Sequence, residues 1–116
     1  MLSLPSAIRI FLCTEPTDMR RGFDRLAEMV RSVVGQDPLS GHLFVFRSRC
    51  GNRLKLLYWD RDGYALWYKR LEKGRFAPPA RVGQDGRIDS RELAMMLEGL
   101  EEMTVRRRIR FEMGPS

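Results

Sequence analysis

From Gly41 onward the chain contains three runs in which side chains alternate between two faces, separated by short turn-forming segments. The runs are HLFVFRSR, RLKLLYW and YALWYKRL, and glycine with asparagine, aspartate or lysine occupies the turns. Alternation with a period of two is typical of β-strands, and connections this short join antiparallel neighbours. The sequence therefore predicts an antiparallel β-meander. Apolar residues occur on both faces of the runs, so we expect other elements to cover both faces of the sheet.

Further strands are predicted on either side of the meander. Residues 7–13 alternate in the same way, and a short strand is expected at residues 75–77, just before two prolines. Near the end of the chain, residues 105–111 (VRRRIRF) form either an edge strand with a basic face or a disordered basic arm. We therefore expect a sheet of about five strands within a single domain at residues 1–104, followed by a basic C-terminal tail at residues 105–116.

Two helices are predicted to pack on this sheet. Apolar residues spaced three and four apart predict a long helix from about Asp18 to Val34, which ends at Gly35. Asp89 followed by Glu92 is typical of a capping box, and it predicts a shorter helix at residues 90–98. The expected fold class is α+β, a single domain with an antiparallel β-meander sheet packed with one long and one short helix.

The positive charge of the chain is concentrated in the meander. The net charge is +6, and 18 of the 21 basic residues are arginine. Nine basic and three acidic residues lie between Arg47 and Arg75, so this stretch alone accounts for the net charge. Arginine's planar group suits phosphates and base edges, and a localised basic segment favours a polyanionic partner. The alternative is a solvated surface that only keeps the domain soluble.

The candidate nucleic-acid contacts follow from this charge distribution. Aromatic residues are interleaved with the basic ones, as in proteins that bind single strands, although we expect most of these aromatics in the core. The aromatics are Tyr58, Trp59, Tyr64, Trp67 and Tyr68. The first set of candidate contacts is Arg47, Arg49, Arg53, Lys55, Lys69, Arg70, Lys73 and Arg75. A second set, in the tail, is Arg106, Arg107, Arg108 and Arg110.

No residue pattern points to catalysis. The only histidine, His42, enters a predicted strand, where a structural role is expected, and Cys13 and Cys50 lack the spacing of metal ligands. Asp60 and Asp62 flank a turn, where aspartate is common for conformational reasons. The chain contains no P-loop and no dinucleotide fingerprint. We therefore expect a non-enzyme without metal or cofactor, and no nuclease activity with magnesium or manganese.

The sequence also favours a cytoplasmic protein. No apolar run approaches the roughly 20 residues needed to cross a bilayer. The first residues lack a basic leader followed by an apolar stretch, and two cysteines are too few for a disulfide framework. We expect no membrane partner.

Three segments resemble a known family. They are EPTDMRRGFDRLAEMV at residues 15–30, PLSGHLFVFRSRCGNRLKLLYWDRDGYALWYKRLEKGRF at residues 38–76, and RELAMMLEGL at residues 91–100. Together they are similar to the accessory TnpB proteins of bacterial insertion sequences of the IS66 group. These are distinct from the much larger RNA-guided nuclease that shares the name TnpB.

The resemblance implies a small accessory protein for transposition. Such a protein acts with a separate catalytic transposase and with a third small protein of the same element, and the catalytic acidic residues belong to the transposase. The resemblance therefore implies no catalytic residue in this chain. From the charge distribution we expect DNA, at the element ends or the target, as a direct partner, in a nucleoid-associated bacterial protein. The alternative is a protein-interaction adaptor that docks on the transposase without contacting DNA.

Overall fold

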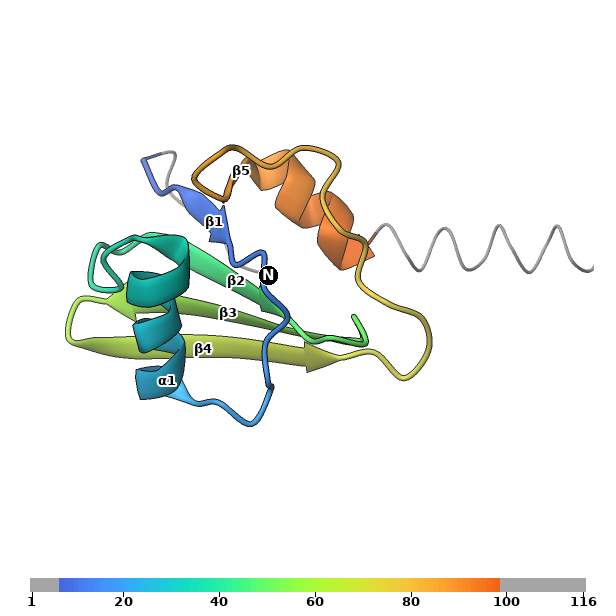
Figure 1. The fold of residues 1–116 in the computed structure, drawn as a ribbon, viewed down its shortest axis with the longest axis horizontal. Helices are drawn as coiled ribbons and strands as arrows, with labels where there is room; N and C mark the ends of the chain where they lie inside the picture. The colour runs from blue at the N-terminus through green and yellow to red at the C-terminus, as the bar shows by residue number, and fades with distance from the viewer. Residues whose placement is uncertain (1–6, 99–116) are drawn as a thin grey trace, which may run out of the picture.

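The computed structural model describes residues 7–98, which form a sheet and the helices that cover it (Figure 1). The elements are β1 (Ile10–Leu12), α1 (Phe23–Met29), a π-helical turn η1 (Val30–Val34), β2 (Leu43–Arg47), β3 (Arg53–Asp60), β4 (Gly63–Arg70), β5 (Arg87–Ile88) and a second helix at residues 90–98. The five strands form one sheet in the order β4-β3-β2-β1-β5. This architecture confirms the predicted α+β class. The predicted tail at residues 105–116 lies outside the described residues.

Strands β2, β3 and β4 form the predicted meander. Both β2 and β4 pair with β3 in antiparallel register, so that Leu57 lies opposite Phe44 on one side and Leu66 on the other. Successive side chains of a strand point to opposite faces of the sheet, so the alternating pattern places large apolar side chains on both faces. The tight β3–β4 connection keeps the register unbroken from the turn to the far end of both strands.

The strands outside the meander differ from the prediction in two ways. Strand β1 pairs in parallel with β2, because a crossover that contains α1 joins the two, and only a long crossover allows parallel neighbours. The prediction of a short strand at residues 75–77 was wrong. The backbone there makes one hydrogen bond to another backbone group, from Phe76 N–H to the Gly51 carbonyl at 2.7 Å, rather than a ladder. The fifth strand is β5, which pairs antiparallel with β1 at the other edge.

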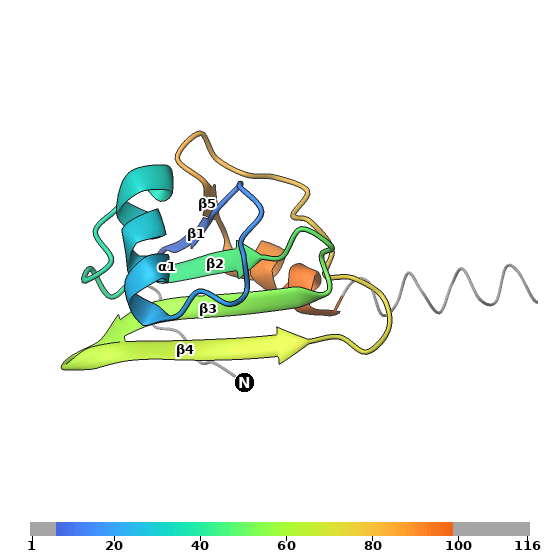
Figure 2. The ribbon, with the colours of Figure 1, turned by 60° about the horizontal axis from the view of Figure 1, so that its bottom comes forward.

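Both faces of the sheet are covered, as predicted. Figure 2 shows α1 on one face and the second helix on the other. Under α1 the buried side chains are Phe11, Cys13, Met19, Leu26, Ala27, Met29, Val30, Phe44, Phe46 and Leu57. On the face of the second helix they are Ile10, Leu12, Leu43, Val45, Leu54, Leu56, Phe76, Ile88, Leu93 and Met96. The helices thus hold a two-sided core together, and the fold depends on both.

The first helix begins five residues later than predicted. Asp18 lies before the helix: its carboxylate accepts the Arg20 backbone N–H at 2.9 Å and pairs with the Arg20 guanidinium, which closes a turn. The N-cap is Gly22, in an extended conformation. At the other end Gly35 ends η1 as predicted, with a positive φ of 75° that disfavours other residues.

Replacing Asp89 by alanine is expected to lower the free energy of unfolding by about 1 kcal/mol. The Glu92 N–H donates to the Asp89 carboxylate at 2.8 Å at the start of the second helix, whereas the Glu92 carboxylate accepts the Ala80 N–H at 3.0 Å. Half of the predicted capping box is therefore present. Urea denaturation would measure the loss. The matched control is Ser90→Ala, and equal stability of the two variants would contradict the capping role.

Candidate nucleic-acid interface

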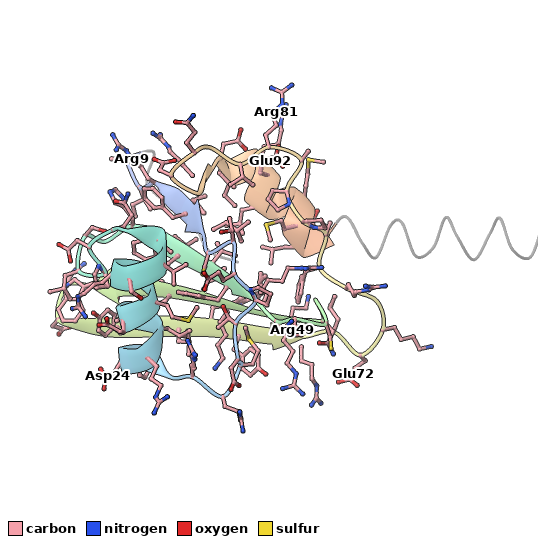
Figure 3. The ribbon with its side chains drawn as sticks, in the orientation of Figure 1. Arg9, Asp24, Arg49, Glu72, Arg81 and Glu92 are labelled. Atoms are coloured by element: carbon pink, nitrogen blue, oxygen red, sulfur yellow. The ribbon has the colours of Figure 1, made fainter. Side chains whose placement is uncertain are left out.

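Seven of the eight candidate contacts predicted in the meander region gather at one end of the sheet because of its topology. In an antiparallel meander, β2 ends where β3 begins and β4 ends, so residues far apart along the chain meet there. We call this region the basic end; it comprises Arg47, Arg49, Arg53, Lys69, Arg70, Lys73 and Arg75. Glu72 is the only acidic residue in residues 47–53 and 69–75. Figure 3 places Arg49 and Glu72 together at this end, with Asp24 far from them.

Two of these arginines lie directly opposite each other. The register pairs Arg53 of β3 with Arg70 of β4, and both side chains are on the face that α1 covers elsewhere. Like charges in directly opposed positions repel and destabilise a sheet. Arg70 contacts Glu72 at 3.3 Å, but this ion pair is exposed on both sides and contributes little to stability. A bound anion between the two guanidinium groups would relieve the repulsion.

An exposed aromatic side chain lies beside this arginine pair. Tyr68 is on the same face of β4 as Arg70, and it is 46% exposed. The other four aromatics considered as contacts are half-buried: Trp59 packs edge-on against Tyr64, with ring centroids 5.1 Å apart, and both Tyr58 and Trp67 pack against the core. We expected most of the five aromatics in the core, but none is fully buried: Tyr58, Trp67 and Tyr64 only pack against it. Tyr68 is the one that offers an open ring next to cationic groups.

Lys55 does not belong to the exposed basic surface. It is only 6% exposed, and its Nζ donates to the backbone carbonyls of Met19 at 2.7 Å and Arg21 at 2.9 Å. The Tyr68 ring lies 4.7 Å from the same Nζ, within the range of a cation–π contact. Burial lowers the pKa of Lys55, and the charge of Asp18 partly opposes this shift. The structure therefore corrects the assignment of Lys55 as a contact, because its ammonium group is already used inside the domain.

Arg47 has a mixed role. Its Nε donates to the Phe76 carbonyl at 3.1 Å, which fastens the segment after β4 onto the end of β2. Burial lowers the pKa of Arg47, and nearby Arg75 adds to the effect. The closeness of Arg75 shows how this segment brings a further cation to the basic end. The four arginines predicted as contacts in the tail, Arg106, Arg107, Arg108 and Arg110, lie outside the described residues.

A small cleft adjoins the basic end. Its volume is about 230 Å³, and it lies between the end of β1, the end of β2 and the segment of Pro78 and Pro79. Cys13 lines the cleft, and burial raises the pKa of its thiol. A thiol with a raised pKa is a poor nucleophile at neutral pH. The surroundings of Cys13 therefore do not favour a nucleophilic role for this thiol.

The other residues considered for chemistry have structural surroundings. The Nδ1 atom of His42 accepts the Arg9 backbone N–H at 3.0 Å, which joins the start of β2 to the start of β1. Asp60 and Asp62 lie at the exposed β3–β4 turn, at the opposite end of the sheet from the basic end. Within residues 7–98 there is no cluster of three or more histidine, cysteine, aspartate or glutamate side chains with the spacing of a metal site. Over the same residues, no helix is long and apolar enough to cross a bilayer.

Comparison with known proteins identifies the family. The model of the family described as "IS66 Orf2 like protein" matches residues 8–107. Two uncharacterized proteins of Sinorhizobium fredii (strain NBRC 101917 / NGR234) are similar to the chain. The protein y4hO is 42% identical over 100 residues, which cover 84% of this chain and 87% of that protein. The protein y4jC is 36% identical over 109 residues, which cover 93% of this chain and 92% of that protein.

No solved structure matches the chain, so the assignment is based on sequence similarity. The family match spans all the strands, both helices and the basic end. It confirms the resemblance that the three sequence segments carry. The chain belongs to the IS66 Orf2-like family, whose members are accessory proteins of insertion sequences.

Proposed function

We propose that this protein binds DNA during transposition of its insertion sequence and that the basic end of the sheet contacts the phosphate backbone. The proposal assigns it a non-catalytic role beside the transposase and the third protein of the element, in association with the bacterial nucleoid. The accessory role follows from the family. The binding role is supported by the geometry of the basic end.

The observation that supports this proposal best is the opposed pair Arg53 and Arg70 with Tyr68 beside it. A sheet gains nothing from two like charges in directly opposed positions, but an anionic ligand turns them into a two-armed phosphate clamp. The Tyr68 side chain, which contacts Lys55 Nζ through its ring but is 46% exposed, adds a stacking surface for an unpaired base. Phosphate-directed arginines next to an aromatic side chain suit DNA that has unpaired bases.

Fluorescence anisotropy of labelled DNA tests the proposal. The probes are a duplex that carries an element end, a scrambled duplex of equal length, and one separated strand. We expect binding at about 50 mM salt, with a slope of log affinity against log salt on the order of −3 to −5, because several phosphates are neutralised. If none of the three probes binds the purified chain at this salt, the proposal is wrong for the isolated protein.

The same purified chain and DNA probes, together with a copurification experiment, distinguish DNA binding from the alternative function as an adaptor for the transposase. If the chain copurifies with the transposase from nuclease-treated lysate and fails to bind any probe, docking on the transposase replaces DNA binding as its role. If the purified chain binds the element-end probe in the absence of transposase, it contacts DNA without help from the transposase. A higher affinity for the element-end duplex than for the scrambled duplex would show sequence preference beyond phosphate contacts.

A further inference from the structure

Strand β4 is the outermost strand of the sheet, and within residues 7–98 no element pairs with its outer edge (Figure 2). It is eight residues long, whereas β5 at the opposite edge has two. Proteins usually protect a long edge with proline, a bulge or charged side chains. The first six residues of β4, GYALWY, contain no proline and no charge, and their register with β3 has no bulge. Such an edge is suited to pairing with another strand.

The β3–β4 ladder shows which backbone groups of β4 face outward. Just beyond the strand, Leu71 N–H donates to the Asn52 carbonyl at 2.8 Å. In an antiparallel ladder the hydrogen-bonded pairs recur at every second residue. By this alternation, the N–H and C=O groups of Tyr64, Leu66 and Tyr68 point away from β3. They form a regular row of donors and acceptors on the open edge.

We propose that the outer edge of β4 pairs antiparallel with the same edge of a second copy of this chain, about a two-fold axis at Leu66. In this register Tyr64 lies opposite Tyr68 of the second copy on the α1 face of the sheet. On the other face, Ala65 lies opposite Trp67 of the second copy, so that a small side chain meets a large one. Cross-strand pairs of these kinds stabilise sheets, and such an isologous contact closes on itself as a dimer.

The charges at the two ends of β4 select this partner and this direction. Lys69 and Arg70 form the last two residues of the strand, and the turn before it, Asp60-Arg61-Asp62, has a net charge of −1. Antiparallel pairing of two copies places the basic residues of each beside the acidic turn of the other. Parallel pairing would bring like charges together, which is unfavourable. The edge is therefore complementary to itself in the antiparallel direction.

The side chains on the edge strand have surface left to bury. Tyr68 is 46% exposed, and Tyr64, Leu66 and Trp67 are half-buried although they are large and apolar. A second copy would cover part of this surface. Only two residues of the basic end lie on β4, so most of its cations stay uncovered in the dimer. Because the dimer would place Tyr64 of the second copy opposite Tyr68 and Asp62 of the second copy opposite Arg70, the cations that remain free for DNA are those outside β4, namely Arg47, Arg49, Arg53, Lys73 and Arg75.

Sedimentation velocity of the full chain without DNA tests the dimer. We expect a mass of twice 13.6 kDa at micromolar concentration. Asp62→Lys, at an exposed turn, places a cation against Lys69 and Arg70 of the second copy and should raise the dimer dissociation constant roughly tenfold or more. The matched control is Glu98→Lys, which makes the same charge change on the second helix and should leave the constant unchanged.

Leu66→Pro supplies a second variant. It removes an N–H that points outward and leaves the donors to β3 in place, so proline is tolerated there as it is on natural edge strands. We expect circular dichroism to show a folded protein and sedimentation to show a monomer. If this variant unfolds, the result for Asp62→Lys tests the dimer instead. A monomeric wild-type chain would assign the edge to another partner and overturn the proposal. A wild-type dimer that Asp62→Lys leaves intact would also overturn it.

Discussion

Replacing Lys55 by alanine is expected to lower the free energy of unfolding by about 2–4 kcal/mol. The substitution leaves the carbonyls of Met19 and Arg21 without their donor and removes the cation from the Tyr68 ring. These carbonyls belong to the segment between β1 and α1, which has no regular structure of its own. For a domain of this size the loss corresponds to a fall in melting temperature of about 10–20 °C.

The matched control is Lys69→Ala. Lys69 is exposed on β4, so its removal should change stability by no more than about 0.5 kcal/mol. Thermal unfolding followed by circular dichroism compares the two variants. If Lys55→Ala loses less than about 1 kcal/mol, water replaces the ammonium group at the two carbonyls and the clamp is not a main source of stability.

The double variant Arg49→Gln with Arg53→Gln is expected to weaken DNA binding roughly 10- to 100-fold at low salt and to flatten the salt slope by about 2. Both side chains belong to the basic end, and neither lies on the β4 edge. Because Arg53 opposes Arg70 in the sheet, its neutralisation removes a repulsion. Thermal stability should therefore stay unchanged or rise slightly while affinity falls.

A fall in DNA affinity without a fall in thermal stability would show that the double variant loses a binding contact and does not unfold. The control is Arg81→Gln with Arg91→Gln, which removes the same charge from exposed arginines away from the basic end; Figure 3 shows Arg81 pointing outward on another side of the molecule. Anisotropy titrations should give this control nearly the affinity of the wild type. If both double variants lose affinity equally, net charge rather than the basic end determines binding.

The meander and the second helix could be predicted from the sequence because their signals are local. Alternation, short turns and the Asp89 cap each act within a few residues. The meeting of Arg53 and Arg70 also has a local signal, since a tight turn that pairs Asp60 with Gly63 fixes every pair further along the hairpin. Counting outward from such a turn would have found the arginine pair.

The features that could not be predicted depend on contacts between distant segments. The burial of Lys55 has no signal in its own strand, because a lysine in an alternating run is normally on the open face. Its partners lie more than thirty residues earlier in the chain. These same hydrogen bonds engage the carbonyls of Met19 and Arg21, so the helix begins after them instead of at Asp18. Strand β5 is two residues long, which is too short for any periodicity.

The position of β1 in the sheet has a consequence for how the chain folds during synthesis. Strand β1 lies between β2 and β5, and Ile10 pairs with both Leu43 and Ile88. The meander is local and can form as soon as it leaves the ribosome, and β1 can then pair with β2, but the other edge of β1 stays open until β5 is made. Until then one apolar face of the sheet has no helix over it. A chain that terminates before β5 thus exposes the apolar side chains of this face, which favours aggregation of nascent and truncated forms.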